Sequence, residues 1–283
     1  MPNEWLYVKL CPGDVRLMDG VVLQVVDPCR RDAVERGATR WFFMRYLDAD
    51  GPHIRLRIQA DTDVLNDWHD AWQHALHQRI AALRAGRAEL TGSPRVVFAL
   101  YEPEWDKYGN AEGVALAEEA FEVSSEAALG LVRAAPGAPT RLAVASYLMR
   151  RLARCLPSLD ERMFWAYHDS FWAPPGREPV HPMALSVEAN QLLDQLEQRI
   201  ALAPSVTLHV DAICRATCQA IGRAQQAHVE RRAAHLLLHH LHMSVNRVGV
   251  LPAQEHGLGR RIATMLEPVA PKITTSIDAF ESA

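Results

Sequence analysis

Two arginines and a histidine alternate along one short segment of the chain. Residues 52–58 read Pro-His-Ile-Arg-Leu-Arg-Ile. Because side chains alternate between the two faces of a β-strand, His53, Arg55 and Arg57 would share one face and the aliphatic residues the other. Neighbouring guanidiniums repel unless an anion lies between them, and arginine binds carboxylates or phosphates in a fork. The segment therefore predicts either an anion site or a solvated outer face whose arginines pair with acidic neighbours.

A second set of chemically active side chains follows a short apolar segment. Residues 101–110 read Tyr-Glu-Pro-Glu-Trp-Asp-Lys-Tyr-Gly-Asn. Loops at strand ends often carry functional groups on a rigid scaffold. Two interpretations follow for Tyr101, Glu104, Lys107 and Tyr108: they reach the arginine strand, or they only form a turn.

Histidines gather in a late apolar segment. His235, His239 and His242 are spaced i, i+4 and i+7, so they would share one face of a helix. Such spacing can bind a metal, but the segment has no HExxH pattern and no carboxylate to complete a site. Because imidazole titrates near neutral pH, His242 is a candidate general acid or base, and helix packing without chemistry is the alternative. We expect no metal site.

The first 110 residues supply the scaffold for the first two sets. Four segments have the β-branched and aromatic content of strands: residues 5–10, 40–47, 52–58 and 95–101. Two segments have apolar residues at helical spacing: residues 14–36, with a break near Pro28, and residues 62–85. The order strand, helix, strand, strand, helix, strand predicts a ferredoxin-like antiparallel sheet covered on one face by two helices.

The rest of the chain has an almost wholly helical pattern, with prolines between the apolar-periodic segments. The expected helices are residues 112–134, 139–155, 159–172, 186–202, 207–247 with a break allowed, and 254–267. The fold class is therefore α+β, with a ferredoxin-like part at 1–110 and a helical layer at 111–283 that packs on it as one functional unit. We expect a surface connection at 173–182 and a frayed end after residue 271.

Composition excludes several classes of protein. Of 283 residues, 49% are hydrophobic and 23% are charged, which is typical of soluble globular proteins. A net charge of −4 gives no general attraction to nucleic acid or anionic membranes. The chain has no apolar run near the ~20 residues of a membrane span, no secretory signal, and no P-loop, GxGxxG or GxSxG motif. We expect a cytoplasmic protein without metal or organic cofactor and without direct nucleic-acid binding.

Five segments occur together, in the same order, in one known family. They read Trp5-Leu-Tyr-Val-Lys-Leu, Arg40-Trp-Phe-Phe-Met-Arg-Tyr, Pro52-His-Ile-Arg-Leu-Arg, Tyr101-Glu-Pro-Glu-Trp-Asp-Lys-Tyr-Gly and His242-Met-Ser-Val-Asn-Arg. Through them the chain resembles, over nearly its whole length, the thiopeptide-type bacteriocin biosynthesis family. That family corresponds to the C-terminal elimination domain of class I lanthipeptide dehydratases.

The resemblance implies a lyase of ribosomal peptide natural-product biosynthesis. In the family, a partner domain or protein uses glutamyl-tRNA to esterify Ser or Thr of a precursor peptide. The elimination domain then expels glutamate and leaves dehydroalanine or dehydrobutyrine. Two alternatives stand beside elimination: a [4+2] cycloaddition of two dehydroalanines that forms a pyridine ring, and a non-catalytic module that docks the precursor peptide.

The resemblance also implies partners. The first is a modified precursor peptide, and the second is a separate tRNA-dependent glutamylating protein, because 283 residues leave no room for that domain. Whether the chain forms a homodimer stays open.

The resemblance assigns roles to residues. Arg55 and Arg57 match the family's arginine pair and would hold glutamate carboxylates or the developing enolate, while His242 would act as base or acid. Lys107 stands where the family usually has arginine before Tyr-Gly, so the charge is kept and the fork is lost. These four are the expected catalytic residues. Six others are expected to bind substrate: His53, Tyr101, Glu104, Tyr108, Asn246 and Arg247.

Overall fold

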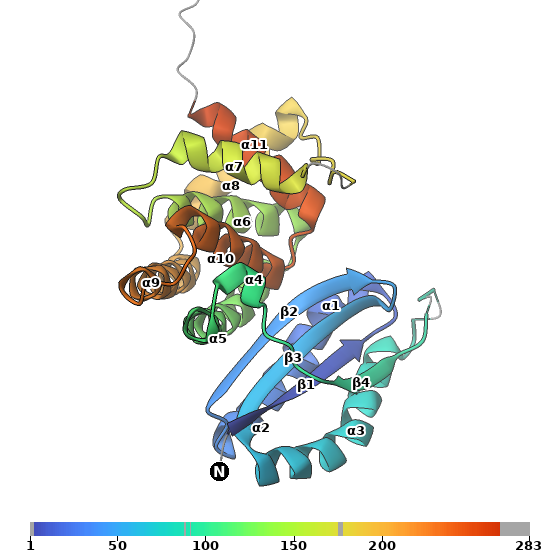
Figure 1. Cartoon of the computed structure of the whole chain (residues 1–283). Helices are drawn as coiled ribbons and strands as arrows, with labels where there is room; N and C mark the ends of the chain where they lie inside the picture. Colours follow the sequence, from blue (N-terminus) through green and yellow to red (C-terminus); the bar gives the residue numbers. More distant parts are fainter. Residues whose placement is uncertain (1–2, 88, 91, 175–177, 267–283) are drawn as a thin grey trace, which may run out of the picture.

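The computed structural model describes residues 3–87, 89–90, 92–174 and 178–266. Its N-terminal part is a four-stranded antiparallel sheet with the strand order β2-β3-β1-β4 (Figure 1). The strands are β1 (Asn3–Cys11), β2 (Arg40–Asp48), β3 (Gly51–Asp61) and β4 (Arg95–Ala99). This order is that of the ferredoxin-like fold. The predicted α+β class is therefore confirmed.

One face of the sheet packs on helices α1 (Met18–Val21), α2 (Asp27–Glu35) and α3 (Thr62–Arg84). Ile54, Leu56 and Ile58 of β3 point to this side and are at most 1% exposed. The strand alternation read from the sequence is thus confirmed, and it sends the neighbouring polar residues of β3 to the other face.

The predicted break near Pro28 is wrong, because the helical segment is continuous there. A 3₁₀ turn (Val15–Leu17), α1, a π-helical turn η2 (Val22–Val26) and α2 follow one another without interruption. Pro28 lies in the first turn of α2, where a missing backbone N–H costs little. The hydrogen bonding changes from α-helical to π-helical in Val22–Val26, before Pro28. The helix then continues through the proline as α2.

Helices make up the rest of the described chain. They are α4 (Trp105–Tyr108), α5 (Ala111–Ala134), α6 (Ala138–Ala153), α7 (Glu161–Trp172), α8 (Val187–Ala201), α9 (Pro204–Gln226), α10 (Ala233–Val248) and α11 (Pro252–Met265).

The segment predicted at 207–247 divides into α9 and α10, and the short α4 was not predicted. The predicted frayed end after residue 271 and part of the connection at 173–182 lie outside the described residues. A domain division at residue 110 stays a prediction.

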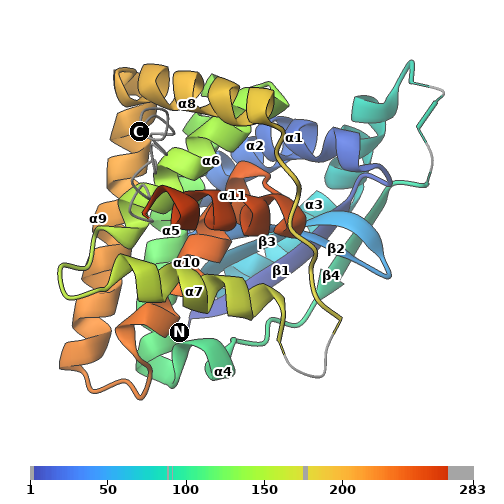
Figure 2. The same cartoon turned by 90° about the horizontal axis from the view of Figure 1, so that it is seen from above.

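The second face of the sheet is covered as well. Phe42 and Met44 of β2 belong to the same apolar core as α5, α6 and α10. Figures 1 and 2 show α10 between the sheet and the pair α7 and α11. Since Arg57 on this face is only 5% exposed, the alternative of a solvated outer face is wrong at this position.

Side chains of α5 and α10 join the helical layer to strand β2, an edge strand of the sheet. The Phe43 backbone N–H donates to Ser125 Oγ at 3.1 Å, and its carbonyl accepts from Arg247 Nε at 2.7 Å. The Asn246 amide accepts from the Arg45 N–H and donates to the Arg45 carbonyl, both at 2.9 Å. These bonds satisfy backbone groups that an edge strand otherwise leaves to water or to another chain.

No helix among the described residues is both long and apolar enough to cross a lipid bilayer.

Replacing Asn246 by alanine should destabilise the fold. The change leaves the N–H and carbonyl of Arg45 without partners under the helical layer, so the free energy of unfolding should fall by about 1–3 kcal/mol. Urea unfolding followed by circular dichroism measures this value. Gln73→Ala, on the exposed side of α3, is the control and should change it by less than about 0.5 kcal/mol. Equal stability of Asn246→Ala and the wild type would contradict the proposed attachment of the layer.

Candidate functional site

Arg57 of β3 is a buried cation among aromatic rings. Its guanidinium carbon lies 4.5 Å from the ring centroid of Tyr101, 5.0 Å from that of Tyr7 and 5.3 Å from that of Phe42. Among the described residues no carboxylate oxygen lies within 4 Å of it; its Nη1 donates to Met44 Sδ at 3.7 Å, and its Nε has no hydrogen-bond partner. Burial lowers the pKa of Arg57. The faces of the aromatic rings stabilise the cation in part, and the Nε–H of Arg57 can still donate a hydrogen bond to a ligand.

A second buried guanidinium lies beside the first. Arg247 of α10 is fully buried, lies 4.6 Å from the ring centroid of Phe121 and donates to the carbonyls of Phe43 and Met243. Its Nη2 and the hydroxyl of Tyr108 have no partner in the described part of the chain. Burial lowers the pKa of Arg247 to about 9 and raises that of Tyr108.

Unpaired donors therefore define the site. Arg57 Nε, Arg247 Nη2 and the Tyr108 hydroxyl are buried without partners in the described structure, and a buried donor without an acceptor costs about 1–3 kcal/mol. A bound anionic oxygen would recover this cost. The arrangement is thus suited to stabilising negative charge on a ligand or intermediate.

Glu118 of α5 adds a carboxyl group that the sequence analysis missed. Tyr101 donates a hydrogen bond of 2.6 Å to it, and the Glu118 residue is 6% exposed. Burial raises the pKa of Glu118 and also that of Tyr101. A signal was present in the sequence, because Glu118 stands four residues after Val114 and three before Phe121, on the apolar side of the helix.

The cavity at this cluster is small. Its lining includes Arg57, Tyr101, Glu104, Tyr108 and Glu118, and its volume is about 10 Å³, about the room of one water molecule. Four of the predicted site residues therefore meet here.

An ion pair stands beside the cavity. Lys107 Nζ lies 2.6 Å from Glu104 Oε1, and both side chains are about one-third exposed. Because this pair is at the surface, it can separate at little cost when a larger group enters.

Arg55 and His53 lie in a different environment, near the β2–β3 turn. Arg55 donates to Asp48 at 3.3 Å and to His53 Nε2 at 3.2 Å, and its guanidinium carbon lies 3.3 Å from the ring centroid of Tyr46. His53 Nδ1 donates to the Gly51 carbonyl at 2.9 Å. Arg55 therefore has an acidic partner that Arg57 lacks, and neither Arg55 nor His53 lines the cavity.

His242 of α10 contacts helices α7 and α11. Its Nδ1 lies 2.8 Å from Glu255 Oε2, and its ring lies 5.3 Å from the ring of Trp172 and 6.2 Å from that of Phe171. Its side chain is 22% exposed. These partners differ from those of the buried arginines, so His242 and the arginines occupy separate environments.

A different histidine of α10 packs on the cavity wall. The ring of His240 lies 5.6 Å from Tyr108 and 5.7 Å from Phe121. Burial lowers the pKa of His240 to about 3, so this imidazole is neutral at physiological pH.

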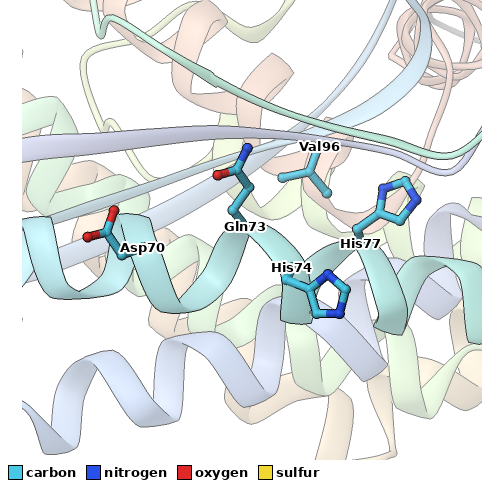
Figure 3. Close-up of a pocket in the computed structure, with 5 residues that line it drawn as sticks. All are labelled: Asp70, Gln73, His74, His77 and Val96. Carbon is cyan, nitrogen blue, oxygen red and sulfur yellow. The ribbon is translucent and has the colours of Figure 1, made fainter.

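A hollow on the other side of the sheet has ligand-like spacing but no convergent geometry. It lies between α3 and β4, has a volume of about 450 Å³ and is lined by Asp70, Gln73, His74, His77 and Val96. Figure 3 shows the His74 ring turned away from the other labelled side chains. The described residues contain no group of three His, Cys, Asp or Glu side chains that could hold a metal ion.

Comparisons with known proteins identify relatives of this fold. Residues 5–264 match the family described as lantibiotic biosynthesis dehydratase C-term. The tRNA-dependent lantibiotic dehydratase MibB from Microbispora sp. 107891 shares 22% identity at a TM-score of 0.60, over 91% of this chain and 27% of MibB. The chain thus spans about a quarter of MibB.

Two further solved structures have a length similar to that of this chain. TsrL shares 16% identity at a TM-score of 0.54, over 93% of each chain. TbtD, the pyridine synthase of thiomuracin biosynthesis, shares 14% identity at a TM-score of 0.59, over 92% of this chain and 97% of TbtD. At these identities the likeness shows a common fold. No curated protein matches the sequence.

The buried His240 should make the stability of the protein depend on pH. Its pKa is about 3 in the folded state and about 6.5 in the unfolded chain. Between these values only the unfolded state binds the proton. The free energy of unfolding should therefore fall as the pH is lowered from about 6.5 towards 3, by about 1.4 kcal/mol per pH unit.

Urea unfolding at pH 7 and pH 5 tests this dependence. Wild-type protein should lose about 2 kcal/mol more than His240→Leu between the two pH values. His77→Leu, which removes an exposed imidazole of α3, should keep the wild-type dependence. If His240→Leu also keeps it, His240 is not neutral in the folded protein at pH 5.

Proposed function

Because the chain belongs to the family of lantibiotic biosynthesis dehydratase C-terminal domains, we propose that it is a lyase acting on a glutamylated precursor peptide. It eliminates glutamate from esterified Ser or Thr and leaves dehydroalanine or dehydrobutyrine. The observation that carries this proposal is the cluster of buried donors without acceptors at Arg57, Arg247 and Tyr108 in the described structure. The elimination passes through an enolate and releases a carboxylate, and both are anions that such donors stabilise.

The reaction requires three tasks. A base removes the α-proton of the esterified residue, and the electron pair moves to the adjacent carbonyl oxygen as an enolate. The enolate then expels the ester group, the Cβ–O bond breaks, and glutamate leaves with a carboxylate at the former ester carbon. A cation must accompany each anionic oxygen, because the site excludes most of the water that would otherwise solvate it.

We assign these tasks to the following residues. Arg57 and Tyr108 donate to one carboxylate of the departing glutamate, which extends away from the carbon that the base deprotonates. Lys107, whose side chain is about one-third exposed beside the cavity, receives a carboxylate of the departing glutamate after it separates from Glu104. His242 is the proposed base, since its side chain is partly exposed and its Nδ1 hydrogen bond leaves Nε2 available as a proton acceptor.

The proposal includes two partners. One is the modified precursor peptide, and the other is a separate tRNA-dependent protein that glutamylates it. MibB, the relative described as a tRNA-dependent dehydratase, is several times longer than the matched region.

The second candidate function is formation of a pyridine ring from two dehydroalanines. It is favoured by the match with the pyridine synthase TbtD, which covers 97% of TbtD. Lysine at position 107 in place of a forked arginine is compatible with this reaction, because a cycloaddition releases no glutamate that needs a bidentate partner.

One mass-spectrometric experiment separates the functions. The protein is incubated with a glutamylated precursor peptide and, in a second reaction, with a peptide that already contains two dehydroalanines. Elimination releases glutamic acid in the first reaction, and cycloaddition releases the leader peptide in the second. Binding of both peptides without any mass change would indicate a docking module and contradict an enzymatic role.

Replacing Arg57 by glutamine should stop elimination. The buried positive charge is lost, so kcat for glutamate release should fall about 10²–10³-fold, and glutamylated peptide should accumulate in the mass spectrum. Arg79→Gln, on the exposed side of α3, is the matched control and should keep full activity. Full turnover by Arg57→Gln would refute the proposed role of this cluster.

A further inference from the structure

A buried carboxylate faces the proposed base from a neighbouring helix. Glu255 stands in the first turn of α11 and is 1% exposed. Its Oε2 lies 2.8 Å from His242 Nδ1. The N-terminal turn of a helix favours negative charge, because its backbone N–H groups point towards that end. The two residues therefore form a close contact between α10 and α11 that is closed to water on the carboxylate side.

The other oxygen of Glu255 has no comparable partner. His168 Nε2 lies 3.5 Å from Glu255 Oε1, but it also lies 3.4 Å from Trp172 Nε1. An indole N–H can only donate, so it uses His168 Nε2 as an acceptor and leaves no proton there for the carboxylate. Oε1 accordingly has no hydrogen bond within the described structure.

Charge supports the same pairing. Burial would raise the pKa of Glu255, but His242 beside it lowers it to about 2, so the carboxylate is ionised at neutral pH. A neighbouring pair between α7 and α11 is separate from it: His256 Nε2 lies 2.7 Å from Asp169 Oδ1, and His256 Nδ1 lies 2.6 Å from the Val180 carbonyl. His256 thus has its own partners, and His242 remains the hydrogen-bond partner of Glu255.

We propose that Glu255 is a positioning residue for His242. An ionised carboxylate accepts only, so the shared proton belongs to His242 Nδ1 and Nε2 is left unprotonated to accept a proton from substrate. When Nε2 takes that proton, the imidazolium forms next to a buried negative charge, which stabilises it. The catalytic meaning of this pairing rests on the proposed function, whereas the pairing itself does not.

Packing alone gives a poor account of a glutamate at this position. A buried carboxylate with a single hydrogen bond costs free energy, and a side chain of similar volume without charge is often as stable. Glu255→Gln therefore keeps the size and removes the charge, and it is expected to fold. Asp169→Asn is the control, because it removes the carboxylate that pairs with His256, the residue next to Glu255.

The first test measures His242 directly by ¹⁵N NMR of labelled histidines, with His242→Gln used to assign its signals. In the wild type, Nδ1 should carry the proton. In Glu255→Gln the amide can donate as well as accept, so the proton should no longer be confined to Nδ1 and the Nε2-protonated tautomer should appear. Asp169→Asn should leave these signals unchanged. An unaltered tautomer of His242 in Glu255→Gln would overturn the proposal.

The second test uses the pH dependence of glutamate release. With Glu255→Gln, kcat at pH 7 should fall at least about tenfold with little change in KM, and the acid limb of the profile should move to lower pH, because the base has become weaker. Glu255→Asp should recover part of the rate. A merely structural role would lower thermal stability and leave the limb in place, so an unshifted limb would reject the positioning role.

The two tests also separate this inference from the proposed function. If the NMR coupling is present and the wild type releases no glutamate from a glutamylated peptide, elimination is refuted and the His242–Glu255 pairing stands. If glutamate is released and the coupling is absent, the pairing is refuted and elimination stands.

Discussion

The arrangement of the molecule depends on how edge strand β2 is completed. A strand at the edge of a sheet has backbone N–H and carbonyl groups without strand partners, and here α5 and α10 supply side-chain partners instead of a fifth strand. Ser125, Asn246 and Arg247 thereby fix the distance and register between sheet and helices. A different register would leave buried polar backbone groups without partners, so this arrangement of the two halves is strongly preferred.

The candidate site follows from the same attachment. Arg247 uses one part of its guanidinium to bind β2 and presents another part, without a partner in the described structure, near Arg57 and Tyr108. Two buried cations repel each other and carry a desolvation cost, and aromatic rings offset only part of it. The hydrogen bonds between the helical layer and β2 keep the two guanidiniums buried. A bound anion would offset the desolvation and repulsion that the aromatic rings do not. The fold thus holds an unfavourable charge arrangement that substrate can relieve.

Local patterns were enough to predict much of this architecture. Alternation in β3 and the helix boundaries marked by prolines depend on neighbours in sequence, and the structure agrees with them. The environments of Arg55 and Arg57 could not be distinguished in this way. Both point to the same face, yet Asp48 lies close in sequence and pairs with Arg55, while the rings and helices that enclose Arg57 come from distant segments. Glu118 was missed for the same reason, because only the packed layer brings α5 to Tyr101.

Helix α10 contacts the sheet, the buried cavity and helix α11, each through a different side of the helix. Asn246 binds β2, His240 packs against Tyr108, and His242 faces Glu255. Residues two positions apart on a helix point in nearly opposite directions, so His240 and His242 meet different surroundings although they are close in sequence. Burial without a charged partner keeps His240 neutral. A buried carboxylate favours a proton on His242. Because the same helix is bonded to the sheet at its C-terminal end, any displacement of β2 would also change where His242 stands relative to its substrate.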